Sequence, residues 1–444
     1  MYTAGRLGAQ RESAAHPSRT VRRTRRLTSM QNTKSLLIAT LSSAILIAAV
    51  PFTGSAVVSG SSEKVLYSFS GGSDGANPAG ALVADKAGNL YGTTSQGGSS
   101  NCTAGCGIVF ELTPPATRGG MWSETVLCRF TGGSDGAAPE SNLTFDAAGN
   151  LYGTTAGGGG ASHAGTVFEL APPSTKGGAW TEKVLYSFAG GSDGESPVAG
   201  LVLDAAGNLY GTTFFGGTTN AGTVFQLMPP ATEGGAWTEK VLHTFGRGND
   251  GLDPQAGLIV DNRGALYGTT ITGTVFKLAP PAWSEKVLFN FTGGGSNGSW
   301  PCAPISRQGS LYGLTRLGGS QSNTGTAFQL SPASGGAWTE TTLYSFTGGD
   351  DGGEPCGTLI FDQAGNLYGT ASGNGQNIPG TVFKLTPPSA PGGAWTETTL
   401  HKFGGSNDGL SPLAGVIFGK GGALYGTTSG GGSSGGGTVF TVVP

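Results

Sequence analysis

The sequence predicts an all-β protein, a seven-bladed β-propeller with four antiparallel strands in each blade. One phrase recurs seven times at intervals of 46 to 61 residues, and each copy holds four short apolar segments between Gly, Pro and Asp turns. A unit of this size cannot bury its own apolar faces, so successive copies must stack on one another. The copies are marked by Phe69, Phe130, Phe188, Phe245, Phe291, Phe346 and Phe403.

The third copy shows the four predicted strands of a blade in chain order. Residues 198–204 form the innermost strand, and Gly207 closes a tight turn into a second strand over 208–213. A glycine-rich loop leads to a third strand over 223–227, which a Pro-Pro pair ends, and the outermost strand covers 237–245. Period-two alternation predicts one face of this outermost strand, formed by Trp237, Glu239, Val241, His243 and Phe245.

The two ends of the array complement each other. The last copy stops after a third strand over 438–443, whereas the first apolar segment, 63–69, is a fourth strand without its blade. We therefore expect the N-terminal strand to complete the last blade and close the ring, because an open array would expose unpaired strand edges. The sequence thus predicts a single propeller domain over 63–444.

Residues 1–56 resemble a leader. Residues 1–29 are interpreted as an extension from an upstream start codon, and 30–56 as a signal peptide with a basic start, an apolar stretch over 35–50 and cleavage after Ala56. Sixteen apolar residues fall short of the roughly 20 that span a bilayer, although an uncleaved anchor is the alternative. We expect an exported protein, extracellular, periplasmic or at the cell surface, with no stable membrane span after cleavage.

Charge argues against nucleic acid as a partner. Residues 1–56 hold eight of the 24 Lys and Arg residues and one of the 27 acidic residues, so the rest of the chain carries a net charge of −10. Binding of phosphates requires clustered Lys and Arg, which the repeats lack. We expect a monomer, with an extracellular glycan or protein as its partner.

Five cysteines fit an oxidising compartment. Cys102 and Cys106 lie in one loop and are predicted to pair, with a metal site of the CxxxC type as the alternative. Cys302 and Cys356 each follow a proline in neighbouring copies, so they could bridge two blades if their Cα atoms approach within about 7 Å. Cys128 is predicted to be a buried free thiol.

Two phrases carry a family resemblance, namely GLVLDAAGNLYGTT over 200–213 and GTVFQL over 222–227. The chain resembles the bacterial tandem-repeat family named for its GloVer motif, the choice-of-anchor tandem repeat GloVer-containing proteins. The resemblance implies an exported protein and supplies no catalytic residues. Because the sequence ends at Val443-Pro444 without a sorting tail, a freely secreted or periplasmic product is expected.

The most regular polar feature is the phrase GGSDGxxP, which joins each outer strand to the next inner strand. Carboxylate oxygens suit Ca²⁺, so a ring of cation sites is one hypothesis. The other is turn chemistry, in which each carboxylate accepts hydrogen bonds from its own loop, and this alternative is favoured because all copies need the turn. The equivalent positions are Asp74, Asp135, Asp193, Asp250, Asn297, Asp351 and Asp408.

Residues that break the repeat on the same face are the candidates for ligand binding. An acidic rim with aromatic side chains could hold a sugar by stacking or a cation by cation–π contact. The candidates are Glu195, Asp253, Trp300 and Glu354 before the prolines, and Phe215 and His163 in the loops between second and third strands.

No known catalytic motif of the serine hydrolase, zinc protease or P-loop type occurs in the sequence. The first hypothesis is therefore a binding or interaction module for an extracellular glycan or protein. The second is a propeller enzyme, a glycan hydrolase or lyase with an acidic site at the channel mouth. The third is a structural protein of the envelope, which predicts a face without a pocket.

Overall fold

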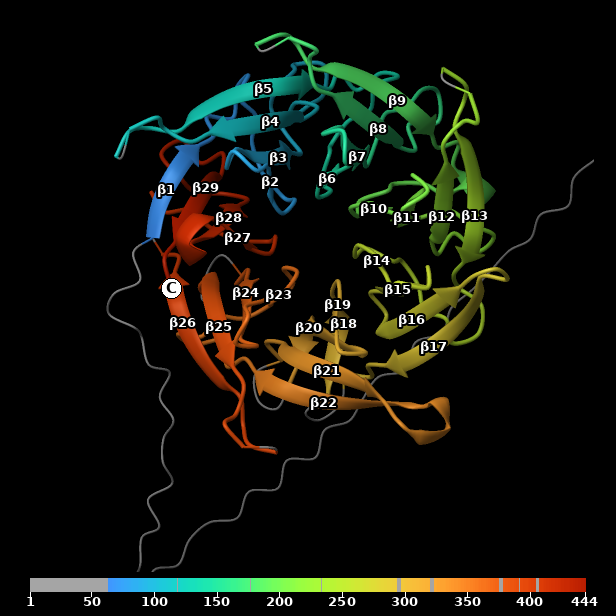
Figure 1. The fold of residues 1–444 in the computed structure, drawn as a ribbon, viewed down its shortest axis with the longest axis vertical. Coiled ribbons are helices and arrows are strands. Elements are labelled where there is room, and N and C mark those ends of the chain that lie inside the picture. Colours follow the sequence, from blue (N-terminus) through green and yellow to red (C-terminus); the bar gives the residue numbers. More distant parts are fainter. Residues whose placement is uncertain are drawn as a thin grey trace, which may run out of the picture. The chain divides into compact units, whose positions relative to one another are not determined.

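The described part of the chain is a ring of seven β-sheets (Figure 1). The computed structural model describes residues 63–444 except 118, 176, 233, 294–296, 320–322, 375–377, 391 and 405–406. They belong to a compact unit that spans Gly54–Pro444, and the predicted leader lies outside the described residues. The sequence prediction of a seven-bladed, all-β propeller is confirmed.

Each blade is numbered here in chain order, and its strands run from the channel outward. Blade 1 contains β2 (Val83–Ala84), β3 (Leu90–Thr94), β4 (Ile108–Thr113) and β5 (Ser123–Arg129). Blade 2 contains β6 (Thr144–Phe145), β7 (Leu151–Thr155), β8 (Thr166–Ala171) and β9 (Thr181–Ser187). Blade 3 contains β10 (Val202–Leu203), β11 (Leu209–Thr213), β12 (Thr223–Met228) and β13 (Thr238–Thr244). Blade 4 contains β14 (Ile259–Val260), β15 (Leu266–Thr269), β16 (Thr274–Ala279) and β17 (Ser284–Asn290).

The remaining blades follow the same order with one irregular member. In blade 5 the inner position is divided between two strands that both pair with β20. Blade 5 contains β18 (Gly298–Pro301), β19 (Ile305–Arg307), β20 (Ser310–Gly318), β21 (Thr326–Pro332) and β22 (Trp338–Ser345). Blade 6 contains β23 (Ile360–Phe361), β24 (Leu367–Ala371), β25 (Thr381–Thr386) and β26 (Thr396–Lys402). Blade 7 contains β27 (Ile417–Phe418), β28 (Leu424–Thr428), β29 (Thr438–Val442) and β1 (Glu63–Ser68).

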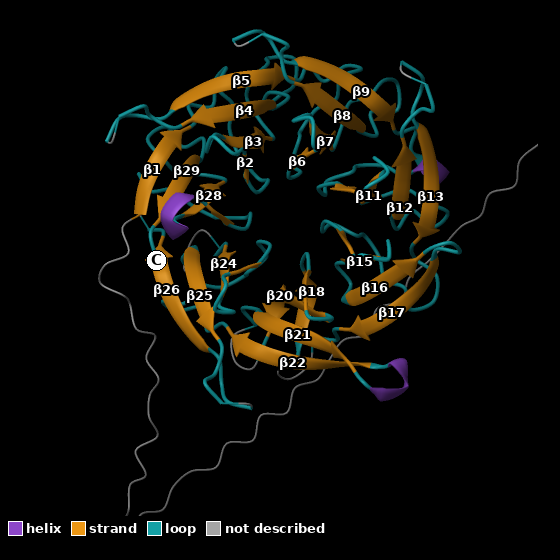
Figure 2. Ribbon diagram, viewed as in Figure 1, coloured by secondary structure: helices purple, strands orange, loops and turns teal. Residues whose placement is uncertain are grey.

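The ring closes between the ends of the described chain. Strand β1 pairs antiparallel with β29, from Glu63 opposite Val442 to Ser68 opposite Thr438, and so supplies the outer strand of blade 7. The predicted closure by the N-terminal strand is therefore confirmed. Short 3-10 turns at Gly191–Asp193, Ser334–Gly336 and Lys420–Gly422 are the helical segments of the described residues (Figure 2), and no described helix is long and apolar enough to cross a membrane.

The innermost strands are shorter than the sequence predicts. In blade 3 the ladder covers only Val202–Leu203 instead of 198–204. The preceding segment turns its hydrogen-bonding groups to the neighbouring blade, where Thr154 Oγ1 donates to the Ala199 carbonyl at 3.2 Å. Equivalent threonine-to-carbonyl bonds join other neighbouring blades, from Thr93 to Ser141, Thr370 to Ala414 and Thr427 to Gly80. The segment before the inner strand therefore forms hydrogen bonds between neighbouring blades instead of extending the strand.

A β-bulge in every outer strand overturns the predicted face of 237–245. In blade 3, Phe225 lies opposite Val241 and Val224 opposite His243, so Leu242 is the extra residue. An extra residue shifts the phase of alternation by one and moves the following side chains to the other face. Trp237 accordingly packs against the core between blades 2 and 3, whereas Phe245 packs between blades 3 and 4. The bulged residues are Leu66, Leu127, Leu185, Leu242, Leu288, Leu343 and Leu400.

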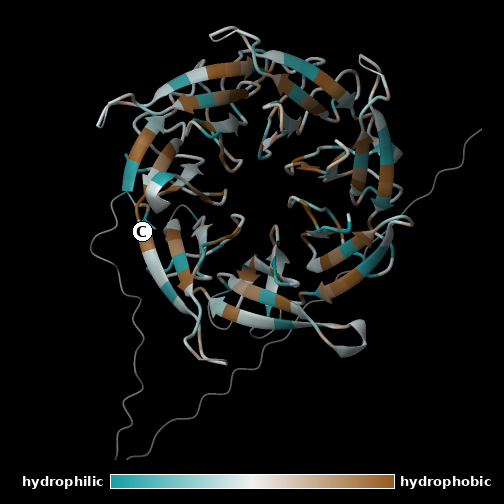
Figure 3. Cartoon of the chain, viewed as in Figure 1, coloured by the Kyte–Doolittle hydropathy of each residue, from teal (hydrophilic) through white to brown (hydrophobic). Residues whose placement is uncertain are grey.

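Seven apolar clusters, one at each blade interface, form the core. Hydrophobic stretches recur on the third and fourth strands of the blades (Figure 3). At each interface the phenylalanine after one outer strand meets the phenylalanine of the next blade's third strand, with ring centroids 4.7–5.2 Å apart. The pairs are Phe69–Phe110, Phe130–Phe168, Phe188–Phe225, Phe245–Phe276, Phe291–Phe328, Phe346–Phe383 and Phe403–Phe440.

The glycine of NLYGTT makes room for this contact. Gly211 lies directly opposite Phe225 in the ladder, and a Cβ at Gly211 would approach Phe225 Cζ to 2.6 Å. Glycine in a strand normally weakens it, but here an aromatic ring covers the exposed backbone. The same arrangement recurs in the other blades at Gly92, Gly153, Gly268, Gly313, Gly369 and Gly426.

Gly211→Ala is expected to lower the free energy of unfolding by about 1–3 kcal/mol, because the added methyl group overpacks the interface between blades 2 and 3. Thermal unfolding followed by circular dichroism measures the change. Gly404→Ala is the matched control, since a Cβ there meets nothing within 4 Å. Equal melting temperatures for the two variants would contradict the role given to the glycine.

Candidate functional site

One face of the ring carries both types of loop that the sequence singles out. Because the strands of a blade alternate in direction, the loops from outer to next inner strand and from second to third strand open on the same side, here called the mouth face. The turns from first to second strand and the loops from third to outer strand open on the opposite face. The candidate residues from the repeat all belong to the mouth face.

The Asp ring lies in tight turns that it stabilises itself. Asp135 accepts hydrogen bonds from the backbone N–H and the hydroxyl of Thr131, both at 2.7 Å, and Asp351 does the same with Thr347 at 2.8 and 2.6 Å. Hydrogen bonds from backbone N–H groups also reach the side chains of Asp74, Asp193, Asp250 and Asp408. The recurring aspartate is therefore explained by its role in the turn, where its carboxylate accepts hydrogen bonds from its own loop.

The outer strand supplies a further partner to most of these turns. The hydroxyls of Tyr67, Tyr186 and Tyr344 donate to Asp74, Asp193 and Asp351 at 3.1, 2.6 and 2.9 Å. His243 Nε2 lies 3.3 Å from Asp250 Oδ2, and His401 Nε2 lies 3.4 Å from Asp408 Oδ2. Where the turn has Asn297 instead of aspartate, the outer strand has Phe289, which has no hydrogen to donate.

Cation binding at the ring stays a prediction. Within the described ranges, no group of three or more His, Cys, Asp or Glu side chains lies close enough together to hold a metal ion. Carboxyl groups instead interact in pairs at the blade interfaces, where the glutamate of one outer strand meets the aspartate of the preceding turn. The interacting pairs are Glu63–Asp408, Glu124–Asp74, Glu182–Asp135, Glu239–Asp193 and Glu285–Asp250.

These interface glutamates resist ionisation. Burial, followed by repulsion from Asp193, raises the pKa of Glu239 to about 7, and its Oε1 is buried without a hydrogen-bond partner among the described residues. Burial and the facing aspartate likewise raise the pKa values of Glu63, Glu124 and Glu285 to about 7. The blade interfaces therefore hold carboxyl groups that change charge near neutral pH.

The residue before each proline of the connecting loops adopts a left-handed conformation. Its φ lies between 53° and 59° in all seven copies, at Asn77, Ala138, Ser196, Asp253, Trp300, Glu354 and Ser411. Such backbone is unfavourable for a side-chain-bearing residue and persists only where the surroundings hold it. At Glu354 three hydrogen bonds do so, from its N–H to Thr324 O at 2.9 Å and to its carbonyl from the N–H and the hydroxyl of Ser372 at 3.3 and 2.9 Å.

The residue after each proline lines a cavity on the ring axis, here called the funnel. The funnel has a volume of about 290 Å³ and receives residues from all seven blades. Deeper in the channel the walls are mostly aliphatic side chains and backbone of the inner strands. The seven residues after the prolines are Ala79, Glu140, Val198, Gln255, Cys302, Cys356 and Leu413.

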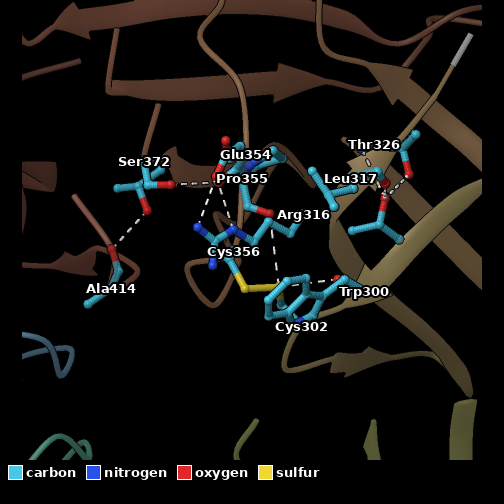
Figure 4. Close-up of a disulfide and its surroundings, with 12 residues drawn as sticks. Trp300, Cys302, Arg316, Leu317, Thr326, Glu354, Pro355, Cys356, Ser372 and Ala414 are labelled. Atoms are coloured by element: carbon cyan, nitrogen blue, oxygen red, sulfur yellow. Dashed lines mark hydrogen bonds and ion pairs between the residues drawn. A yellow bond between two sulfur atoms is a disulfide. The ribbon is translucent and has the colours of Figure 1, made fainter. Parts of the chain in front are cut away.

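Blade 5, the irregular blade, supplies the one basic side chain among the described residues that line the funnel. Arg316 Nε and Nη2 donate to Glu354 Oε2 of blade 6 at 3.1 and 2.9 Å, and the Arg316 guanidinium lies over the Trp300 ring, 5.0 Å from its centroid (Figure 4). Beside them a disulfide joins Cys302 to Cys356. Trp300, Arg316 and both cysteines line the funnel.

The structure contains both disulfides that the sequence suggests. Cys102 and Cys106 are joined within one loop with Cα atoms 5.2 Å apart, and Cys302 and Cys356 join blades 5 and 6 with Cα atoms 5.4 Å apart. Cys128 is a half-buried free thiol, whose pKa burial raises to about 12.

The other predicted ligand residues do not join this cluster. Glu195 lies two residues before its proline and forms a backbone bridge with Phe215, which is 40% exposed and packs edge-on against Phe214. Asp253 occupies a left-handed position in blade 4, where burial raises its pKa, and His163 is exposed in the loop after β7. Of the six predicted residues, only Trp300 lines the funnel, and Glu354 reaches it through Arg316.

Sequence reasoning missed Glu140 and Gln255, which line the funnel. Glu140 lines the cavity with an exposed side chain, and partial desolvation of its carboxyl by the surrounding atoms raises its pKa. The signal was present, because the residue after each proline varies as much as the residue before it. What was lacking was the direction of each side chain relative to the axis.

Among known protein families, one that is defined by a repeat matches this sequence. The sequence matches the family described as Gloeobacter/Verrucomicrobia repeat over residues 55–273, 175–346 and 271–444. No curated protein shows a significant match.

Two solved structures match this chain in part. The "putative 6-phosphogluconolactonase" of Bacteroides uniformis is 16% identical, with a TM-score of 0.44 over 70% of this chain and 81% of that one. The "putative oxidoreductase (glucose dehydrogenase)" of Thermus thermophilus is 16% identical, with a TM-score of 0.39 over 69% of this chain and 96% of that one. Both likenesses are too remote to carry chemistry from those proteins to this one.

Loss of the disulfide between blades is expected to cost more stability than loss of the local one. Cys302→Ala with Cys356→Ala should lower the free energy of unfolding by about 4 kcal/mol, and Cys102→Ala with Cys106→Ala by about 2 kcal/mol, because closing 54 residues removes more entropy from the unfolded chain than closing 4. Denaturant unfolding measures both, and the reverse order would contradict this expectation.

Stability is expected to fall as pH rises through the range in which the interface glutamates ionise. The folded-state pKa of Glu239 lies above its ordinary value of 4.5, so between about pH 4.5 and pH 7 the folded protein holds more protons than the unfolded one. At pH 8, Glu239→Gln should therefore raise the free energy of unfolding by about 1 kcal/mol after allowance for solvent screening. At pH 5 the variant should match the wild type, and an equal effect at both pH values would contradict the assignment.

Proposed function

The chain belongs to the Gloeobacter/Verrucomicrobia repeat family, and on that basis we propose that it is an exported binding module that takes a saccharide at the funnel. The observation that supports this most directly is the concentration of unlike residues from blades 5 and 6 at the mouth of an otherwise repetitive ring. The repeated residues are explained by packing. Residues that break the repeat and lie close together in space therefore indicate a ligand site.

Trp300 is the residue that favours a saccharide. Arg316 covers one face of its ring, and the ring also lines the funnel. Aromatic rings bind the C–H faces of sugars, while nearby amide and hydroxyl groups bond to the sugar hydroxyls. The funnel supplies such groups on Asn142, Gln255 and Ser372.

Binding fits the funnel better than glycan cleavage does. Hydrolysis by the usual route requires two carboxyl groups about 5–10 Å apart. Among the described residues that line the funnel, Glu140 is the one carboxyl group, and Glu354 beyond it is paired with Arg316. The enzyme alternative rests on the raised pKa of Glu140, which would suit a general acid.

Export is supported by the leader-like residues 1–56 and by the two disulfides, since disulfides persist in oxidising compartments. A face with a pocket also argues against a purely structural protein of the envelope.

Trp300→Ala is expected to weaken saccharide binding about tenfold, and Trp300→Phe to restore most of it, because an aromatic face worth roughly 1–1.5 kcal/mol is removed and then replaced. A glycan array finds the ligand, and isothermal titration calorimetry gives the dissociation constants. Phe418→Ala is the control, since Phe418 is 38% exposed at the opposite end of its inner strand.

Unchanged affinity in Trp300→Ala, or an array without any bound saccharide, would contradict the proposal. Mass spectrometry of the incubated ligand separates binding from cleavage. Shortened or unsaturated products that disappear in Glu140→Gln would establish the enzyme alternative instead.

A further inference from the structure

The charges that face the funnel are few and of opposite sign. Among the described residues that line it, Arg316 of blade 5 and Glu140 of blade 2 carry charge, and the remaining lining groups are neutral. The two cysteines of the lining are joined in a disulfide and do not titrate. Any ionic ligand of the funnel is therefore selected by these two side chains.

Arg316 is held in place by contacts that use only some of its N–H donors. Its guanidinium carries five N–H donors, and the contacts with Glu354 employ Nε and Nη2 on a single carboxylate oxygen. Trp300 supports the plane of the group from one side. About a third of the side chain, 35%, stays accessible, so a ligand can reach the remaining donors. A fixed guanidinium of this kind matches the oxygens of a carboxylate or sulfate.

We propose that the funnel recognises an anionic saccharide unit, with the acidic group of the sugar bound to Arg316 and its ring against Trp300. This rests on the proposed function, which it makes more specific. Glu354 acts as a positioning residue that orients the guanidinium. The acidic group is a carboxylate, as in a uronic acid, or a sulfate ester. The carboxylate is planar and the sulfate tetrahedral, but both offer negatively charged oxygen atoms to the same N–H donors.

Glu140 makes the recognition dependent on pH. Its ionised carboxylate repels an anion in the shared cavity, whereas the protonated form can donate a hydrogen bond to it. Partial desolvation of its carboxyl raises the pKa of Glu140, so the repulsive form appears at a higher pH than for a fully solvated glutamate. The guanidinium of Arg316 attracts the ligand, its partner Glu354 offsets part of that charge, and the uronate stays ionised above about pH 4.

The test is calorimetric titration of the purified protein with an oligogalacturonate, its methyl ester and a sulfated galactan fragment of equal length. We expect an acidic ligand to bind at least about tenfold more tightly than the methyl ester at pH 5, and to lose about fivefold in affinity by pH 8. Arg316→Gln should abolish the preference for the acid, and Glu140→Gln should abolish the dependence on pH. Arg263→Gln, an equal loss of charge in an exposed turn of the opposite face, should change neither.

The results distinguish recognition of an anionic sugar from saccharide binding in general. Binding of the uronate or of the sulfated fragment alone, with loss in Arg316→Gln, supports anionic recognition and identifies the acidic group. Equal binding of acid and ester that still depends on Trp300 overturns this inference and leaves the saccharide-binding function intact. Absence of binding by all three ligands and by the glycan array overturns both. A pH dependence that persists in Glu140→Gln overturns the role of that residue.

Discussion

The ring depends on the contact between phenylalanines of neighbouring blades. Each contact joins the end of one outer strand to the middle of the next blade's third strand, and twelve of these rings are almost fully buried. A glycine opposite the second ring is what allows the close approach. Because burying one phenylalanine side chain contributes roughly 1.5–3 kcal/mol, seven such contacts supply a large share of the stabilisation of the interfaces.

The bulged leucine makes that contact possible from a single strand. Core-facing side chains before Leu242 pack at the interface between blades 2 and 3, and those after it pack at the interface between blades 3 and 4. One outer strand therefore contributes to two cores. Glu239, before the bulge, interacts with the aspartate of the preceding turn, whereas His243, after it, lies beside Asp250 of the following turn, so the polar contacts of the strand change side at the same point as its apolar packing.

The site occurs where one blade departs from the pattern that packing requires. In blade 5 the inner position is divided between β18 and β19, and Arg316 and Trp300 occur where the other copies have no basic residue and no tryptophan. The disulfide to blade 6 and the pairing with Glu354 hold these residues together. The six regular blades act as a rigid frame for one irregular blade, which concentrates specificity at one side of the funnel.

The pattern of the sequence was enough to predict the seven blades, the four strands and closure by the N-terminal strand, because repetition, turn residues and apolar runs are local properties. It failed where one inserted residue changed the phase of β13, since the bulge appears only when two strands are paired. The candidate site was predictable to the level of the loops and of Trp300. The meeting of Trp300, Arg316 and Glu354, and the inclusion of Glu140 in the lining of the funnel, depended on how the blades are arranged around the channel. Residues from different blades approach one another only in the closed ring, and the direction of each side chain there is set by backbone and packing that no single repeat contains.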